Sequence, residues 1–500
     1  MNNKTFLIIA AAALAGCGAR TTTAVRAGPA PQTETYTYAL EAVDRTLGLR
    51  RDTSVTHVLA DISAANLRRT DSTLVAFGTR NTFSDTLSNT RGIGAARRWI
   101  HGQLEQDGKA CGGCLEVEYY GEVVPVQRAG GRAVNVVDVL AWLPGRDTTH
   151  VVVIGGHYDS CICSIRGGGN DSTADAPGAN DDGSGTSAVM ELARVFGKHY
   201  PKGLNSSILF VAYAAEEQGL LGSEILAKHL HDAGYHVIAG MADDMDGNVS
   251  GGGRTDSTSM RIFAADPDNS PSRELGRYVW ALDAVYLPSF EVLPVWRLDR
   301  IQRGGDHEPY INLGDAGLRF SERVENYNRQ HLPTDDFAHV NFGYLANVAR
   351  VNAMTVASLA AAPVTPANAR ATRQGRAGAT ATSNAEPTNS GGQDWTLSWE
   401  ASPGATSYEV LVRSTTSPTW EQVIPVGGAT SCTLERQLDD EWAGVRAVGA
   451  HGARSMAASM PAPNPPRLIN RPPATGAPAA PAPPRTPRSA PSAPPPTCGA

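Results

Sequence analysis

Residues that can bind a metal ion follow two apolar segments of this chain. His157 closes the segment VVVIGGH, and Asp159 comes two residues later. Glu216 and Glu217 directly follow the apolar segment SILFVAYAA. Neutral imidazole and carboxylate oxygens are both ligands that Zn²⁺ accepts. These residue types at the ends of apolar segments therefore indicate metal chemistry.

Three further segments carry ligand types. The loop PGANDDGSG contains Asp181 and Asp182, the segment MADDMDGN contains Asp244, and the polar stretch NYNRQHLPTDD contains His331. Each is weak alone, because an Asp-Asp pair in a Gly-rich loop is usually turn chemistry. All five segments in one chain are a strong indication of a metal site.

The adjacent acids Glu216 and Glu217 suggest a division of labour. Neighbouring residues at a strand end point in different directions, so one carboxylate can bind metal while the other stays free as a general base. Asp159 is placed to hydrogen-bond the imidazole of His157 and fix its tautomer. We therefore expect one of the two acids, together with Asp159, to serve catalysis.

The segments that position these residues alternate between apolar, strand-like runs and runs with helical spacing. Continuous apolar runs at 151–154, 207–214 and 237–242 read as buried strands. Helical spacing follows from 184 onward, over 219–230 and over 343–361. This alternation predicts an α/β fold with a mostly parallel sheet flanked by helices. Sites in such sheets lie beyond the carboxyl ends of the strands.

From about residue 65 to 361, the segments GGHYDS, PGANDDGSG, AYAAEEQGLLGS, ADDMDG and the late His resemble metallopeptidase family 28. That resemblance to co-catalytic zinc aminopeptidases implies an α/β sandwich with a central mixed sheet. It also implies two Zn²⁺ ions and Glu216 as the general base. The implied ligands are His157 and Asp244 for one ion, Glu217 and His331 for the other, and Asp181 as a bridge.

The family pattern selects among neighbouring acids. It favours Asp181 over Asp182 from its place after the Gly-Ala pair, and Asp244 over Asp243 and Asp246 from its place before Met. The chain departs from the pattern in one place: Gln330 precedes the late His, where some members carry a Tyr. The residue that stabilises the oxyanion therefore stays open.

The function expected from this resemblance is that of an aminopeptidase acting on peptides or proteins. A carboxypeptidase and a glutaminyl cyclase are alternatives on the same fold. An adhesion lipoprotein that has lost its metal is an alternative of another class. With a net charge of −7 and no long basic stripe, the chain gives no sign of nucleic-acid binding. Oligomeric state cannot be read from the sequence.

The N-terminus predicts export. One Lys precedes an apolar run that ends in Leu14-Ala15-Gly16-Cys17. Small residues before a Cys resemble a bacterial lipobox, which implies cleavage before Cys17 and lipidation of its sulfur. We therefore expect a membrane-anchored lipoprotein of the bacterial cell envelope, at the outer membrane or facing the periplasm if the cell is Gram-negative.

The C-terminal third changes composition. The segment around Trp399, Tyr408 and VRAVGAHG resembles a fibronectin type III module, which we expect to be a spacer or docking accessory that is dispensable for catalysis. The six Cys other than Cys17 are expected to form disulfides or to be inert thiols. The predicted parts are a signal peptide with lipobox (1–17), a tether (18–35), a peptidase domain (36–362), a loose linker (363–394), the fibronectin-like module (395–460) and a disordered Pro/Ala-rich tail (461–500).

Overall fold

A mixed eight-stranded sheet forms the centre of the larger domain. The computed structural model describes residues 45–163, 171–373, 394–460 and 495–499. The strand order is β1-β2-β4-β3-β5-β10-β8-β9, and the four neighbours β4, β3, β5 and β10 run parallel. The strands are β1 (Glu116–Val126), β2 (Arg132–Leu143), β3 (Asp147–His157), β4 (Ser206–Tyr213), β5 (His236–Asp243), β8 (Ser259–Ala264), β9 (Glu291–Val295) and β10 (Gly317–Glu322).

The β-branched run in β3 explains why this strand lies at the middle of the sheet. Val151 and Val153 belong to the apolar cluster on one face, whereas Val152 and Ile154 belong to the cluster on the other. All four side chains are fully buried. A continuous apolar run is what a strand covered on both faces requires.

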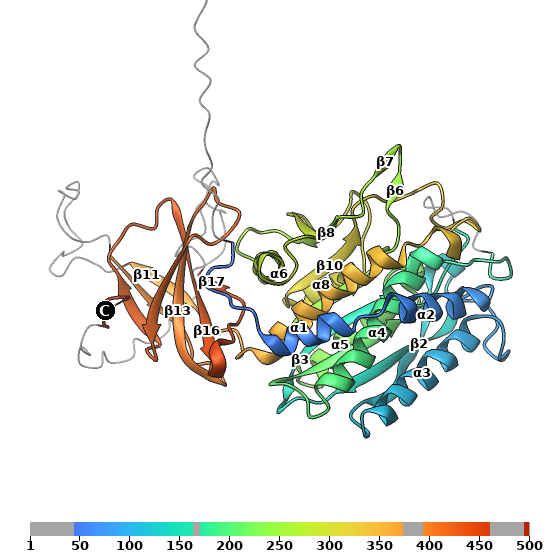
Figure 1. Cartoon of the computed structure of the whole chain (residues 1–500), viewed down its shortest axis with the longest axis horizontal. Coiled ribbons are helices and arrows are strands. Elements are labelled where there is room, and N and C mark those ends of the chain that lie inside the picture. The colour runs from blue at the N-terminus through green and yellow to red at the C-terminus, as the bar shows by residue number, and fades with distance from the viewer. Residues whose placement is uncertain (1–44, 164–170, 374–393, 461–494, 500) are drawn as a thin grey trace, which may run out of the picture. The chain divides into compact units, whose positions relative to one another are not determined.

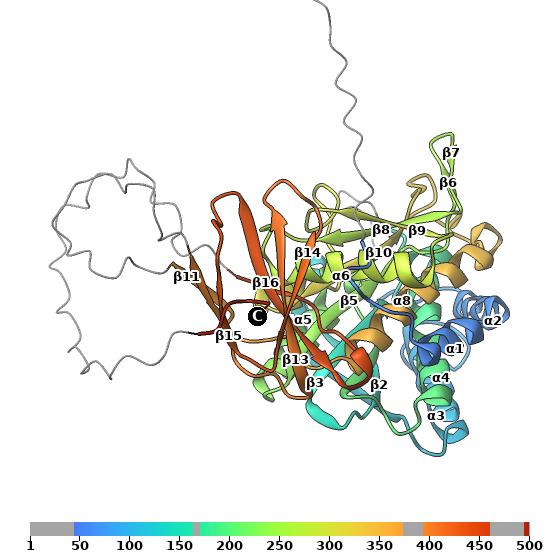
Figure 2. The ribbon, with the colours of Figure 1, turned by 60° about the vertical axis from the view of Figure 1, so that its left-hand side comes forward.

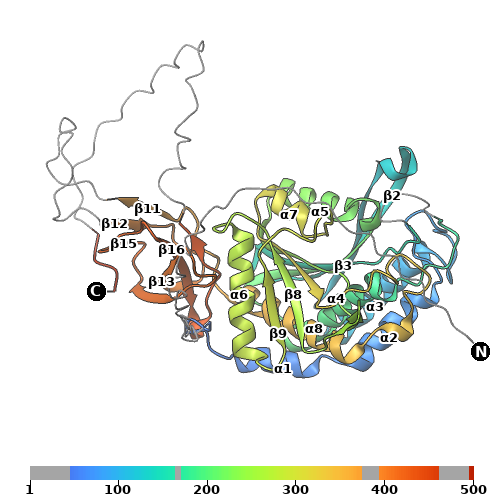
Figure 3. The ribbon, with the colours of Figure 1, turned by 90° about the horizontal axis from the view of Figure 1, so that it is seen from above.

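Helices cover both faces of the sheet (Figure 3). α5 and α7 contribute to the smaller apolar cluster on one face, and the remaining helices contribute to the larger cluster on the other. The predicted α/β class with a central mixed sheet is confirmed. The helices are α1 (Thr53–Asp61), α2 (Ala64–Ala76), α3 (Ile93–Ala110), α4 (Ser184–His199), α5 (Leu221–Asp232), α6 (Pro271–Tyr286), α7 (Glu308–Leu313) and α8 (Phe342–Ala361).

A second, all-β domain follows (Figures 1 and 2). Its two antiparallel sheets have the orders β11-β12-β15 and β14-β13-β16-β17. Leu397, Val410 and Val445 are fully buried between them. Its strands are β11 (Arg370–Arg373), β12 (Trp395–Ser398), β13 (Ala405–Ser414), β14 (Gln422–Gly427), β15 (Ser431–Leu434), β16 (Glu441–Gly449) and β17 (Ala458–Ser459). A short hairpin, β6 (Ser250–Gly251) with β7 (Arg254–Thr255), projects from the larger domain.

Two of the predicted boundaries need correction. The predicted linker 363–394 contains β11, which pairs with β12 and so belongs to the small domain. The predicted tail 461–500 contains Cys498, which forms a disulfide with Cys432 of β15. A four-residue strand has too little periodicity to be read from sequence, and a disulfide partner 66 residues away has no local signal. Residues 374–393 and 461–494 lie outside the described part, as do the predicted signal peptide and tether.

The two domains are joined by buried polar contacts at α6, and not only by a loose linker. Trp420 Nε1 donates to Glu274 Oε2 at 2.8 Å, and Arg277 Nη1 donates to Glu274 Oε1 at 2.6 Å. Arg413 Nη2 of β13 donates to Asp268 Oδ2 at 2.6 Å. Glu274, Arg277, Arg413 and Trp420 are all at most 2% exposed. The small domain therefore shares a buried interface with the larger domain.

The remaining described cysteines also form disulfides, Cys111–Cys114 and Cys161–Cys163. Across the described ranges, no helix combines the length and apolar character needed to cross a membrane.

Candidate active site

The first predicted ligand, His157, stands at the carboxyl end of β3 with its ring oriented by the backbone. Its Nδ1 lies 3.0 Å from the main-chain oxygen of Asp159, where it donates a hydrogen bond. Nε2 is fully buried and has no hydrogen-bond partner among the described residues. That atom lies 3.2 Å from Asp181, 3.8 Å from Asp244 and 4.0 Å from Glu216. A free imidazole nitrogen therefore faces three carboxylates.

The carboxylate of Asp159 lies near the His157 ring and also holds the turn that carries Glu216. Its Oδ1 lies 3.6 Å from His157 Nδ1 but accepts a hydrogen bond from the Glu216 main-chain N–H at 3.1 Å. Its Oδ2 accepts from Thr82 Oγ1 at 2.9 Å. The carbonyl of Asp159 orients the ring, and the carboxylate holds the turn that carries Glu216.

The neighbouring acids Asp181 and Asp182 point in different directions. Asp182 Oδ2 accepts from the His157 N–H at 3.0 Å, and its Oδ1 accepts from the Gly185 N–H at 2.9 Å. Asp181 instead turns toward the cavity, where Oδ1 approaches His157 and Oδ2 lies 3.1 Å from His331 Nε2. The structure thus places Asp181, and not Asp182, between the two histidines.

Glu216 and Glu217 diverge after β4 because the chain turns sharply there. Ala215 adopts the left-handed conformation, with φ of 59°, and the two acids begin the short helix η3 (Glu216–Gln218). Glu217 Oε2 lies 3.2 Å from His331 Nε2, whereas Glu216 faces His157. Buried Glu217 Oε1 has no partner in the described part of the chain. The pair therefore serves two different histidines.

Asp244, just beyond β5, is the acid of this group that pairs with an arginine among the residues that the structure describes. Its Oδ2 lies 3.0 Å from Nη2 of Arg319, which is fully buried, while Oδ1 faces His157. Asp243 is turned away and accepts from Asn352 Nδ2 at 2.6 Å. The carboxylate oxygens of Asp246 are buried and line no part of the cavity. Of the three acids, Asp244 is the one that faces the cavity.

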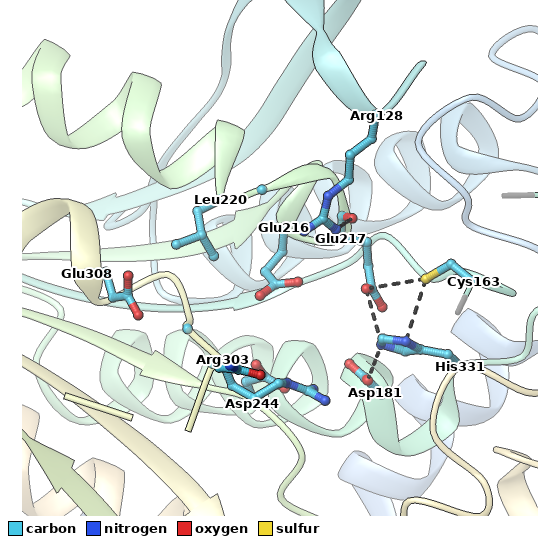
Figure 4. A pocket seen from close by; sticks show the side chains of 13 residues that line it. Arg128, Cys163, Asp181, Glu216, Glu217, Leu220, Asp244, Arg303, Glu308 and His331 are labelled. Atoms are coloured by element: carbon cyan, nitrogen blue, oxygen red, sulfur yellow. Dashed lines mark hydrogen bonds and ion pairs between the residues drawn. The ribbon is translucent and has the colours of Figure 1, made fainter. Parts of the chain in front are cut away.

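His331 completes the cluster from the loop before α8, with φ of 59°. Figure 4 shows its ring among Glu217, Asp181 and Cys163. Cys163 Sγ lies 3.6 Å from His331 Nδ1 and 3.8 Å from Glu217 Oε2. Asp181 is therefore shared by two groups, one with His157 and Asp244, the other with His331 and Glu217.

The electrostatics indicate that this cluster binds a cation. Burial tends to lower the pKa of His157, but its contacts with Asp159, Asp181 and Asp244 raise that pKa well above the usual value. Burial likewise opposes protonation of His331, yet Glu217 and Asp181 raise its pKa to about 11. Burial raises the pKa of Glu216 well above its usual range, and the acids Glu217 and Asp244 add to that shift. Buried carboxylates need a positive partner, and a metal ion can replace these protons.

A cavity of about 480 Å³ opens beside the cluster. It is lined by all the predicted ligands except His157, by Glu216, and by residues that the sequence did not reveal, namely Arg128, Arg303 and Glu308. Gln330 does not line this cavity but donates from Nε2 to Asp181 Oδ2 at 2.7 Å. Tyr327 is 51% exposed and lines a different cavity. Neither residue stands out as an oxyanion donor.

Asp306 and His307, which lie between Arg303 and Glu308 in the sequence, do not line the cavity. Asp306 accepts from Ser223 Oγ at 2.5 Å, and His307 Nε2 lies 2.9 Å from the Leu298 oxygen. The sequence gives no indication of the role of Arg319, because this residue lies within an apolar strand, β10, far in sequence from the ligand motifs.

Comparison with known proteins agrees with this geometry. Residues 138–356 match peptidase family M28. A probable zinc metalloprotease of Leptosphaeria maculans is 34% identical over 80% of this chain and 95% of its own length. The chain belongs to peptidase family M28. A probable zinc metalloprotease of Pyricularia oryzae is also 34% identical, over 82% of this chain and 85% of its own length.

The M28 assignment makes the chain a zinc metalloprotease. Its fold is similar to that of LapA from Legionella pneumophila, with a TM-score of 0.50 and 23% identity over 63% of this chain and 78% of that one. The donor set fits zinc, since two imidazoles and buried carboxylates converge with unpartnered atoms at His157 Nε2 and Glu217 Oε1.

Proposed function

We propose that the chain is an M28 aminopeptidase that uses two zinc ions to release N-terminal residues from peptides. The observation that carries the two-ion proposal is the position of Asp181, whose two oxygens lie 3.2 and 3.1 Å from Nε2 of two different histidines. In this proposal His157 and Asp244 would hold one ion, Glu217 and His331 would hold the other, and Asp181 would contribute to both.

Glu216 is proposed as the general base. When bound, zinc would supply the Lewis acidity that activates water and polarises the scissile carbonyl. Glu216 accepts a proton from the attacking water and returns it to the leaving amine. The hydrogen bond from its main-chain N–H to the Asp159 carboxylate positions it.

The lining of the cavity supports an amine-bearing substrate. Outside the proposed ligands, Glu216 and the half-buried Glu308 both present carboxylates to the cavity. A carboxylate that no metal occupies can attract a protonated α-amine. These acids favour recognition of the N-terminal end of a peptide.

A peptide with both ends free, incubated with the full chain and followed by mass spectrometry, tests this proposal. Stepwise loss from the N-terminus, abolished by a chelator and restored by zinc, is the expected result. Loss from the C-terminus would make the chain a carboxypeptidase instead. A shift of −17 or −18 Da on an N-terminal Gln or Glu substrate would identify a glutaminyl cyclase.

We further propose that the chain is exported and anchored through Cys17, and that the small domain is a fibronectin type III-like module. The three disulfides suit an oxidising compartment, and two sheets of three and four strands suit such a module. The curated relatives are fungal, so the anchor is proposed for this chain from its own first 17 residues. Cys17→Ser should leave the precursor unprocessed by the lipoprotein pathway. Wild-type processing and membrane fractionation of that variant would refute the anchor.

A further inference from the structure

Two arginines reach the same cavity as the proposed zinc ligands from separate elements (Figure 4). Arg128 lies in the short helix η1 (Gln127–Ala129) at the tip of the β1–β2 hairpin. Arg303 lies in the loop between β9 and α7. The two side chains approach the carboxylates of the cavity from different sides.

Neither guanidinium forms an ion pair within the described ranges, although carboxylates line the same cavity. Arg128 Nη1 donates to the main-chain oxygen of Glu217 at 2.5 Å. Arg303 Nη1 donates to Gln330 Oε1 at 3.2 Å. Both acceptors are neutral. Each guanidinium has five N–H donors in a planar fork, which matches the geometry of a carboxylate.

Buried contacts of Arg319 hold the loop that carries Arg303. Arg319 Nη1 donates to the Gly304 oxygen at 2.8 Å and to Asp299 Oδ2 at 3.0 Å. The other nitrogen of the same guanidinium, Nη2, pairs with Asp244. One buried side chain thus fixes both a proposed zinc ligand and the backbone next to Arg303. A preorganised loop loses little freedom when it binds a ligand, which favours affinity.

The charge of the cavity supports an anionic group at this end. Two zinc ions would carry four positive charges against the three carboxylates of Asp181, Glu217 and Asp244. The local charge of the ligand cluster would then be positive. Glu216 and Glu308 add two carboxylates to the same cavity, and Arg128 and Arg303 offset them, so the cavity would keep a net positive charge. A carboxylate on the substrate would be attracted to this region.

We propose that Arg128 and Arg303 form a subsite for a substrate carboxylate that lies next to the scissile bond. The carboxylate is either the free C-terminus of a dipeptide or an acidic side chain on the residue after the bond. This inference deepens the proposed aminopeptidase function and rests on it for the identity of the bond that is cleaved.

Two matched pairs of substrates separate the two sources of the carboxylate. Leu-Gly against Leu-Gly-amide tests the free C-terminus, and Leu-Asp-amide against Leu-Asn-amide tests an acidic side chain. We expect wild-type kcat/KM to favour the acid of at least one pair by about tenfold or more, as is usual for a charge-assisted hydrogen bond. A ratio near one in both pairs would overturn the subsite.

A binding measurement makes the test independent of turnover. The analogue of Leu-Gly with a reduced CH₂–NH bond cannot be hydrolysed, so calorimetry gives its dissociation constant and that of its amide. If wild-type kcat/KM favours Leu-Gly over Leu-Gly-amide, tighter binding of the acid analogue than of its amide supports the subsite. If no leucine is released from any substrate while the acid still binds tighter, the aminopeptidase proposal fails and the subsite stands.

The variants Arg303→Gln and Arg128→Gln should bring the preferred acid-to-amide ratio close to one, mainly through KM, with zinc content retained. Matched controls are Arg297→Gln, an exposed position earlier in the same loop, and Arg132→Gln, whose guanidinium lies 4.7 Å from the Phe83 ring centre. Both controls should keep the wild-type ratio. An acid preference that survives in both cavity variants would assign the carboxylate to other residues and overturn the proposal.

Discussion

Buried carboxylates have different partners in the cavity and at the interface of α6 with the small domain. At the interface, Glu274 Oε1 accepts from Arg277 and Ser459, and its Oε2 accepts from Trp420. In the cavity, Asp181 and Glu217 face histidines, and Glu217 Oε1 has no partner in the described part. A buried acid that is fully paired holds two parts of a fold together. Buried acids that face histidines and lack a full set of hydrogen-bond partners can bind a metal cation, which no side chain supplies.

The strongest test of this contrast is removal of the shared acid of the cavity. Asp181→Ala should lose zinc and all measurable hydrolysis, because in our proposal this residue serves both ions. His157→Ala should lose zinc less readily, since it serves one. Zinc per chain after dialysis, measured by elemental analysis, compares the two variants. Equal zinc retention in both would show that Asp181 does not bridge.

The two adjacent glutamates separate a base from a ligand. Glu216→Gln keeps the shape and removes the proton acceptor, so kcat should fall by about 10²–10⁴ while zinc content is unchanged. Glu217→Gln should weaken zinc binding, and excess zinc should restore part of its activity. The reverse pattern, with zinc lost from Glu216→Gln and kept by Glu217→Gln, would mean that the two roles are exchanged.

The parts of this site that the sequence predicts are those located by strand ends. His157, Glu217 and Asp244 lie at or just after the ends of apolar runs that are typical of buried strands, and the parallel strands bring them to one edge of the sheet. The sequence does not predict Arg128 or Arg303, because their approach to the cavity depends on a hairpin and a loop whose paths carry no periodic signal. The same limit explains why β11 and the return of Cys498 were missed.

Removing one charge from the centre of the interface tests how much the interface contributes to stability. Glu274→Gln weakens one of the two carboxylate partners of Arg277, which keeps its pair with Asp268. Complete loss of a buried pair costs about 3–5 kcal/mol, so we expect a smaller loss of folding free energy here, of about 1–3 kcal/mol. Thermal or urea unfolding should show that loss, while zinc content at low temperature is unchanged. Asp232→Asn is the matched control, since its pair with Lys228 is exposed and worth about 0–1 kcal/mol. A loss in Glu274→Gln no larger than in the control would mean that the interface contributes little to stability.

Asp283 of α6 is a buried acid that lies neither in the cavity nor at the interface with the small domain. We expect its replacement to have the smallest effect. Its side chain is 2% exposed, Oδ2 accepts from the Val292 N–H at 3.3 Å, and Oδ1 has no partner in the described residues. Burial raises the pKa of Asp283 from 3.8 to about 7. With no histidine or second acid to share a metal, this group binds a proton. The folded state then holds that proton more tightly than the unfolded state, so its contribution to stability is present below pH 4 and is lost as pH rises toward 7.

Asp283→Asn should therefore raise the melting temperature at pH 8 by a few degrees and change it little at pH 4, because Asn keeps an acceptor for Val292 and carries no charge. The quantity to measure is the difference in melting temperature between variant and wild type across this pH range, which cancels the titration of other groups. Glu224→Gln, at an exposed position of α5 away from Asp283, is the control and should show no such pH dependence. If the difference for Asp283→Asn is the same at both pH values, the acid is ionised in the folded protein. An unpartnered buried carboxylate would then not require either a proton or a metal, and the contrast between cavity and interface would lose its electrostatic basis.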